Sequence, residues 1–147
     1  MVCLGNICRS PMAEGLLRHK AKAAGIPLEI DSCGTTNYHT DEAPDPRAQA
    51  TMLSHGIDIS GLKARQIDPS DFEEFDVIFA MDKSNSKNAS QLAVNEDQLS
   101  KLKLFLSNNV SSGIHEVPDP YFGGDKGFED VYELLNNACD AFLESIR

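Results

Sequence analysis

Apolar positions in the 147-residue sequence follow two spacings, one helical and one made of short continuous runs. The clearest helical pattern is C-terminal, where apolar side chains share one face and Asp and Glu fall outside it. Its apolar positions are Phe128, Val131, Leu134, Leu135, Ala138, Phe142 and Ile146. A second helical pattern runs from Pro11 to about Ala24, with Gly25 as a stop signal. The sequence therefore predicts a helix near each end of the chain.

Short apolar runs predict strands between the helical segments. Residues 77–81 are a continuous apolar run, which suits a strand covered on both faces. Residues 28–30 and 102–106 are interpreted as further strands, and residues 2–3 as the end of a truncated first strand. Strands that alternate with helices predict an α/β fold. We expect a single three-layer, doubly wound domain over residues 1–147, with a mostly parallel four-stranded sheet and helices on both faces.

Aspartates mark the starts of helices in the middle of the chain. The Asp-Pro-Arg sequence at 45–47 predicts a helix that ends near residue 56, because aspartate caps helices and proline suits their first position. Asp82 is expected to cap a helix to about residue 92, and residues 68–70 to cap a short helical turn. Residues 31–39 and 107–127 are expected to be loops. Ligands of such folds bind beyond the carboxyl ends of the strands, which is where Asp82 and these loops lie.

Charge and cysteine usage narrow the class of protein. The net charge of −10 argues against nucleic acid and anionic membranes as partners, since both select basic surfaces. Four cysteines show no zinc-like pair and are too sparse for a disulfide scaffold, which indicates a reducing cytoplasm. No apolar run approaches the roughly 20 residues of a membrane span, and we expect no signal peptide.

Residues 2–11 concentrate the side chains that can carry out chemistry. Five residues separate Cys3 from Arg9, which is enough for the backbone to curl once and point its N–H groups inward at a tetrahedral anion. Gly5 and Asn6 suit the positive-φ turn that this curl needs. The Arg9 guanidinium can then close the ring with two parallel hydrogen bonds.

Ser10 and Pro11 are predicted to start the helix after this loop, with serine as the N-cap and proline at the first position. The positive end of the helix dipole then lies beside Cys3. Thiols in such places ionise more readily than free cysteine, so we expect a thiolate nucleophile at Cys3. The Ser10 hydroxyl is also placed to donate to this sulfur and help it leave.

A purely structural interpretation makes Cys3 a small buried hydrophobe and Arg9 a solvated residue at a helix start. It is weaker, because every residue of the run falls where one anion cradle requires it. Residues 3–11 resemble the phosphate-binding loop of the low-molecular-weight protein tyrosine phosphatases. The resemblance covers nearly the whole chain, including residues 45–48, 64–66, 81–85 and 119–121.

This resemblance implies a role for each residue of the site. It also implies that the reaction needs no metal or cofactor. Cys3 is the nucleophile and Arg9 the phosphate clamp, while Asp119 matches the general acid of the family. Asp-Pro is also an ordinary turn signal, but an aryl phosphate leaves poorly unless its bridging oxygen is protonated. The remaining loop residues bind phosphate or support the loop. These are Leu4, Gly5, Asn6, Ile7, Cys8 and Ser10.

Tyr38 and Tyr121 are the aromatic residues best placed to line a cleft above the loop, since both lie in polar segments. The resemblance implies the same role, because similar positions in the family form the walls of a narrow pocket for a flat ring. Ile7 favours the same substrate, because relatives that act on phosphoarginine tend to carry threonine there. The family often places a histidine where this chain has Leu62. Support of Asn6 then falls to other groups, of which Ser32 and Ser10 are the candidates.

Together these features predict a cytoplasmic, cysteine-dependent phosphatase that acts on phosphotyrosine-containing proteins through a cysteinyl-phosphate, as a monomer or weak homodimer. An arsenate reductase of similar fold is a second interpretation. It ranks lower because residues 82–93 hold no cysteine to relay the oxidation. A third is a non-catalytic module that binds phosphate. We also expect redox regulation, in which Cys8 traps oxidised Cys3 as a disulfide.

Overall fold

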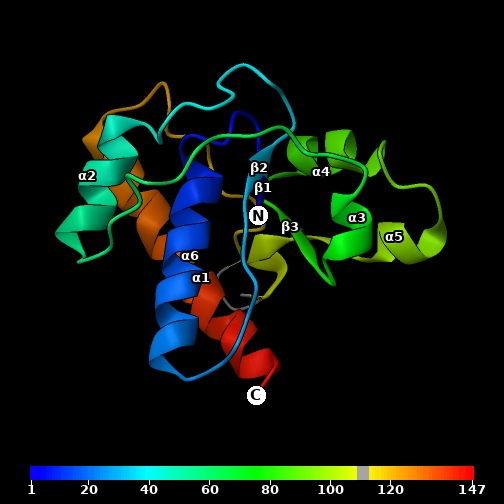
Figure 1. Ribbon diagram of the computed structural model, residues 1–147. Coiled ribbons are helices and arrows are strands. Elements are labelled where there is room, and N and C mark those ends of the chain that lie inside the picture. Colours follow the sequence, from blue (N-terminus) through cyan, green and yellow to red (C-terminus); the bar gives the residue numbers. More distant parts are fainter. Residues whose placement is uncertain (109–112) are drawn as a thin grey trace.

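The computed structural model describes residues 1–108 and 113–147 and shows a parallel sheet with helices on both faces (Figure 1). In this part of the chain the sheet has four strands in the order β2-β1-β3-β4, and each neighbouring pair is parallel. The strands are β1 (Val2–Cys3), β2 (Cys33–Gly34), β3 (Ile78–Ala80) and β4 (Leu102–Leu104). The predicted α/β, doubly wound fold is confirmed.

The helices form two groups, one on each side of the sheet (Figure 1). Three of them pack against one another on one face: α1 (Arg9–Ala23), α2 (Pro46–Ser54) and α6 (Asp125–Ser145). The other side carries α3 (Asp71–Glu74), α4 (Lys83–Ser90) and α5 (Glu96–Ser100). A short 3₁₀ helix, η1 (Phe105–Asn108), follows β4 and contacts α6. Among the described residues no helix is both long and apolar enough to cross a membrane.

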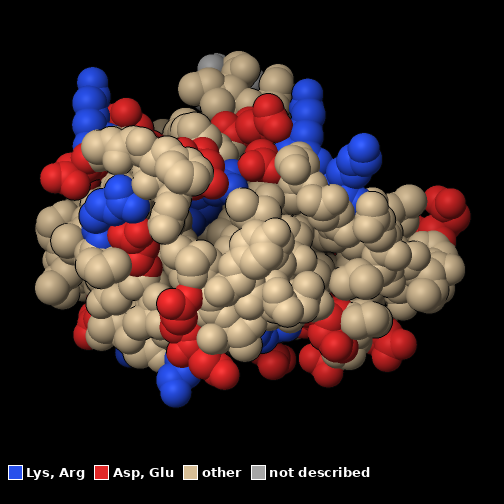
Figure 2. All heavy atoms as spheres, turned by 90° about the horizontal axis from the view of Figure 1, so that it is seen from above, with Lys and Arg blue, Asp and Glu red and all other residues tan. Residues whose placement is uncertain are grey.

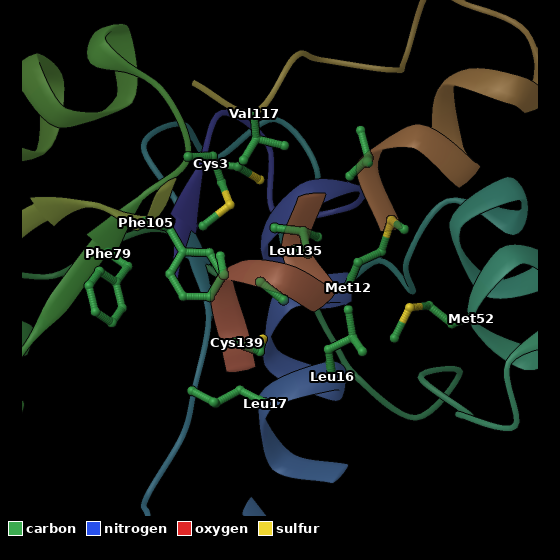
Figure 3. Packing of buried hydrophobic residues seen from close by; sticks show 14 of the residues in the cluster. Cys3, Met12, Leu16, Leu17, Met52, Phe79, Phe105, Val117, Leu135 and Cys139 are labelled. Atoms are coloured by element: carbon green, nitrogen blue, oxygen red, sulfur yellow. The ribbon is translucent and has the colours of Figure 1, made fainter. Parts of the chain in front are cut away.

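Alternate residues along the strands enter two separate cores. Phe79 joins the larger core, whereas its neighbour Ile78 joins the smaller one on the opposite face, as the two-residue period of a strand requires. In the larger core Leu16 of α1 and Leu135 of α6 are buried beside the sheet (Figure 3). Cys3 also belongs to this core, so the loop after it is anchored at the larger of the two cores.

The second strand lies further along the chain than the sequence predicts. Residues 28–30 form no strand, and β2 is Cys33–Gly34, inside the stretch expected to be a polar loop. The register explains the shift, because Val2 pairs with Cys33 and residues 28–30 extend past the start of β1. The Ile30 carbonyl instead accepts a hydrogen bond from Arg18.

The helix starts are partly as predicted. Asp45 and Asp82 do cap α2 and α4 through their side chains. The Ser10 cap is wrong: α1 begins at Arg9, and Cys8 occupies the N-cap without a side-chain hydrogen bond. The Ser10 hydroxyl turns toward Cys3 instead, so the polar contacts of the loop outweigh the usual capping preference.

Three further segments differ from their predictions. The strand expected at 102–106 ends at Leu104, since η1 begins at the next residue, and α5 was not foreseen. The C-terminal helix α6 ends at Ser145, so Ile146 lies beyond it and is exposed, while Cys139 and Leu143 complete the buried face. The long loop expected at 107–127 is interrupted by both η1 and α6, and its residues 109–112 lie outside the described part of the chain.

Candidate active site

The segment from Cys3 to Ser10, which we call the phosphate loop, joins β1 to α1 at the carboxyl edge of the sheet. Asn6 has a φ of 59°, the left-handed conformation that lets the chain turn back on itself. Gly5 does not share this conformation, contrary to the prediction for the pair. Its missing Cβ matters for space, because a Cβ there would lie 2.9 Å from Cδ2 of His39.

Gly34 of β2 lies directly against the phosphate loop. A Cβ at this position would lie 2.8 Å from the carbonyl oxygen of Leu4 and 3.1 Å from the backbone nitrogen of Asn6. Only glycine permits so close an approach of two backbones. No sequence pattern predicted this role beyond the presence of a glycine in a segment expected to be a loop.

The Cys3 sulfur receives hydrogen bonds from within the phosphate loop. The backbone N–H of Asn6 donates to Sγ at 3.3 Å, and the Ser10 hydroxyl lies 3.0 Å from it. Both contacts stabilise negative charge on the sulfur, and the N-terminus of α1 adds its dipole. The loop therefore presents Cys3 as a nucleophile rather than as packing alone.

Asn6 is held by three partners, none of which is a histidine. Its side-chain NH₂ donates to Ser10 Oγ at 2.7 Å and to Ser32 Oγ at 2.9 Å, and its carbonyl oxygen accepts from the backbone N–H of Arg65 at 3.0 Å. The expected support from Ser10 and Ser32 is thus present. Leu62 lies partly buried against the larger core instead.

Arg9 is fixed by acceptors behind the cleft. Its Nη1 donates to Asp82 Oδ2 at 2.6 Å and to the carbonyl oxygen of Val117 at 2.9 Å, while Nη2 lies 3.6 Å from Asp119 Oδ2. A guanidinium has five N–H donors, so these contacts leave others for an anion. The sequence predicted Asp82 only as a helix cap, and its place after a buried strand was the available signal for this second role.

A cleft of about 240 Å³ lies over the phosphate loop. Nine predicted site residues line it: Cys3, Leu4, Gly5, Ile7, Cys8, Arg9, Tyr38, Asp119 and Tyr121. Asn6 and Ser10 are buried and support the loop without lining the cleft. His39 and Phe122 also line it, and sequence reasoning missed both. The rim is open, since Tyr38 is 74% exposed and Phe122 is 93% exposed.

The segment from Val117 to Gly124, which we call the acid segment, carries Asp119, which lines the cleft. Asp119 Oδ1 accepts from the backbone N–H of Tyr121 at 3.0 Å, which orients the carboxylate within its turn. Arg47 of α2 anchors the segment by donating to the carbonyl oxygens of Tyr121 at 3.0 Å and Gly123 at 3.3 Å. Hydrogen bonds from Arg47 also hold the pKa of Asp45 below its ordinary value. The Arg47 side chain is therefore held in place by its ion pair with Asp45.

All four cysteines of the chain are free thiols buried in the structure. Burial raises the pKa of the Cys8 thiol well above its ordinary value and raises the pKa values of Cys33 and Cys139 to about 12. Cys8 also lines the cleft, whereas Cys33 and Cys139 lie away from it. The other thiols therefore stay protonated at neutral pH.

The charge around this site is mixed. Figure 2, which looks onto the molecule from above, shows Lys or Arg atoms recessed near the middle of a face that also carries many acidic side chains.

A second cleft, of about 250 Å³, lies near Met1 and is lined by four acidic residues without a nucleophile, so it does not suit an anion. Those acidic residues are Glu29, Asp31, Glu74 and Asp76. In the described residues no cluster of His, Cys, Asp or Glu could hold a metal ion.

Comparison with known proteins gives a consistent result. Residues 1–147 match the family described as low molecular weight phosphotyrosine protein phosphatase. The chain is 44% identical over 150 residues to the Schizosaccharomyces pombe protein of that description, covering 99% of this chain and 94% of the other. A protein tyrosine phosphatase from Entamoeba histolytica has a similar structure, with a TM-score of 0.93 at 35% identity over 99% of this chain and 93% of that one. A Drosophila arginine phosphatase also has a TM-score of 0.93, at 32% identity over 99% and 95% of the two chains.

Proposed function

The chain belongs to the low molecular weight phosphotyrosine protein phosphatase family, and on this premise we propose that it hydrolyses phosphotyrosine in proteins through a cysteinyl-phosphate intermediate. One observation supports this most directly. Cys3 and Arg9 of the phosphate loop and Asp119, more than a hundred residues further along the chain, line the same cleft. A nucleophile, an anion clamp and a proton donor at one place are what phosphate ester hydrolysis requires.

In the first step the Cys3 thiolate attacks phosphorus, and an S–P bond forms as the bond from phosphorus to the tyrosine oxygen breaks. The Arg9 guanidinium and the N–H groups of the phosphate loop stabilise the charge on the equatorial oxygens. Asp82 and the Val117 carbonyl hold Arg9 in place, which reduces the reorganisation needed as charge develops. The carboxyl group of Asp119 gives its proton to the departing phenol oxygen.

In the second step a water molecule attacks the cysteinyl-phosphate. Asp119, now a carboxylate, takes a proton from this water while the S–P bond breaks and inorganic phosphate is released. The Ser10 hydroxyl, 3.0 Å from Cys3 Sγ, stabilises the thiolate that leaves. No metal ion takes part in either step.

Aromatic side chains at the rim favour an aryl substrate. Tyr38, Tyr121 and Phe122 line the cleft opening and offer faces for stacking on a flat ring. Ile7, inside the loop, lines the same cleft and presents an apolar surface to such a ring. These contacts favour phosphotyrosine over phosphoarginine, although an arginine phosphatase is among the similar structures.

An arsenate reductase mechanism is less well supported. It needs two further thiols that can reach the oxidised nucleophile, whereas Cys33 and Cys139 do not line the cleft and lie in the protein core. Asp119 would also have no step to perform. A non-catalytic phosphate-binding module would not need Asp119 beside Arg9.

Family membership implies phosphoprotein substrates, and we propose the remaining cellular properties from composition. The net charge of −10 disfavours nucleic acid and anionic membranes as partners. The sparse cysteines favour the cytoplasm. We further propose one phosphatase domain, active as a monomer or weak homodimer.

The test is an assay of the purified protein against p-nitrophenyl phosphate, arsenate and peptides that carry phosphotyrosine, phosphoserine or phosphoarginine. We expect hydrolysis of the aryl phosphates and none with a Cys3→Ser control. A preference for phosphoarginine, or arsenate reduction coupled to thiol oxidation, would overturn the proposed specificity.

A further inference from the structure

Glu14 of α1 is a carboxylate buried behind the phosphate loop, and the steps proposed above give it no role. Its side chain is only 4% exposed. Its Oε1 accepts a hydrogen bond from Ser32 Oγ at 2.6 Å, and its Oε2 lies 2.7 Å from Nη1 of Arg18, one turn further along α1. A buried charge is costly unless paired, so Arg18 compensates Glu14 at this position.

The hydrogen bonds around Glu14 form a chain that leads to the nucleophile. Ser32 Oγ lies 2.9 Å from the side-chain nitrogen of Asn6, and that nitrogen lies 2.7 Å from Ser10 Oγ. Ser10 Oγ in turn lies 3.0 Å from Cys3 Sγ. Three side chains, those of Ser32, Asn6 and Ser10, thus connect the Glu14 carboxylate to the sulfur.

Each bond in this chain has a fixed direction, and Glu14 sets the one at the buried end. A carboxylate has no proton, so the Ser32 hydroxyl must donate to it and can only accept from Asn6. The Asn6 NH₂ group donates to both Ser32 and Ser10, because the bond from the Arg65 N–H to the Asn6 carbonyl oxygen fixes the orientation of the amide. Because Ser10 accepts from Asn6, its one proton can go either to the Cys3 sulfur at 3.0 Å or to the carbonyl oxygen of Cys33 at 3.3 Å. A thiolate at Cys3 carries charge and is therefore the stronger acceptor.

We propose that Glu14, held by Arg18, is a positioning residue that fixes Ser32 and, through Asn6, keeps the Ser10 hydroxyl in place beside Cys3. The proposal rests on the proposed function, because it explains how that reaction's nucleophile is stabilised. In this chain Leu62 contributes no polar group to Asn6, so the buried end of the network depends on this ion pair. Of the charged groups described around Glu14, Arg18 is the one in direct contact, and the terminal amine of Met1 on β1 also interacts electrostatically with it.

The experiment measures the rate at which iodoacetamide alkylates Cys3 near neutral pH, followed by mass spectrometry. Alkylation reports the sulfur directly and needs no turnover. The raised pKa values and burial of Cys8, Cys33 and Cys139 keep these thiols slow to react. The same variants are assayed for kcat and KM with p-nitrophenyl phosphate.

We compare Glu14→Gln, Arg18→Met and Arg18→Lys with a control on the same helix, Lys20→Met, which breaks an ion pair with Asp140 of α6. Glu14→Gln and Arg18→Met should slow alkylation about fivefold, the loss expected for one hydrogen bond. They should lower kcat with little change in KM, because the phosphate contacts remain. Arg18→Lys should recover most of the loss, and Lys20→Met should leave the rate unchanged.

Equal alkylation rates in the wild type and Glu14→Gln would overturn the proposal, as would an equal slowing by Lys20→Met. If Glu14→Gln does not fold, the alkylation rates of the two Arg18 variants test the proposal instead. The Arg18 side chain is half exposed, so its replacement should not prevent folding. A wild type that hydrolyses no phosphate ester, with the alkylation pattern as expected, would instead refute the proposed function alone.

Discussion

The phosphate loop and the acid segment both line one cleft, as two sides that are held very differently. In the phosphate loop the polar side chains of Asn6, Arg9 and Ser10 are buried and each has several partners. In the acid segment Asp119 is 37% exposed, and Arg47 reaches the segment from α2. One side of the cleft is fixed by many internal bonds and the other by few.

The difference follows from what each side must recognise. Every substrate of the proposed reaction brings the same phosphate group, so a preformed cradle lowers the cost of binding it. The residues around the phosphotyrosine differ between substrates, and an open segment with exposed aromatics can accept different neighbours. Substitutions on the two sides should therefore have separable effects on the reaction.

The largest effect is expected from Cys3→Ser, which tests whether the cradle works without its nucleophile. Turnover should be lost, because a serine hydroxyl at this place is not activated. Vanadate or phosphate should still bind, since Arg9 and the loop N–H groups remain. Kinetics together with isothermal titration calorimetry would check both parts, and substantial residual turnover would mean that Cys3 is not the nucleophile.

Asp119→Asn should act on the other side of the cleft only. We expect a loss of about 10²–10⁴-fold for substrates with poor leaving groups, because the amide cannot protonate the departing oxygen. Activated aryl phosphates should lose much less. A series of substituted phenyl phosphates measures this, and a uniform loss across the series would exclude Asp119 as the proton donor.

Arg47→Ala should loosen the acid segment while the phosphate loop stays intact. It removes two hydrogen bonds to the Tyr121 and Gly123 carbonyls and a cation–π contact with the Tyr121 ring. A decrease in kcat of roughly fivefold to tenfold is expected for poor leaving groups, with Cys3 alkylation unchanged. Slower alkylation in this variant would show that the two sides are coupled.

Oxidation offers a smaller test that is confined to the phosphate loop. Hydrogen peroxide should oxidise the Cys3 thiolate to a sulfenic acid, and attack by Cys8 would form a disulfide and release water. After dithiothreitol the wild type should recover more activity than Cys8→Ser. Equal recovery, or a peptide map that joins Cys3 to Cys33, would remove Cys8 from this role.

The smallest effect is expected from Leu62→His, which tests whether the phosphate loop lacks support. Asn6 already has three partners, so kcat should change little. The melting temperature should fall, because a polar ring replaces an apolar side chain packed against the core, a change that typically costs about 1 kcal/mol. A clear gain in turnover would show that the existing partners do not hold Asn6 fully.

Local sequence was sufficient where each prediction depended on neighbouring residues. The anion cradle could be foreseen because Cys3, Asn6 and Arg9 lie within one short run, whose backbone must curl. The caps at Asp45 and Asp82 could be foreseen for the same reason, since a cap bonds within its own turn. The α/β class followed from apolar runs that alternate with helical spacing.

Only the tertiary structure decided which distant groups complete the site. The position of β2 depends on its register with β1, which no local pattern encodes, and this is why a strand was expected at residues 28–30. Asp82 reaches Arg9, Arg47 reaches the acid segment, and Ser32 joins Asn6 to Glu14 because the sheet brings separate strand ends to one edge. Such contacts depend on packing between residues far apart in the sequence. The chemistry of Cys3 and Arg9 could be predicted because both lie within one short run of the sequence.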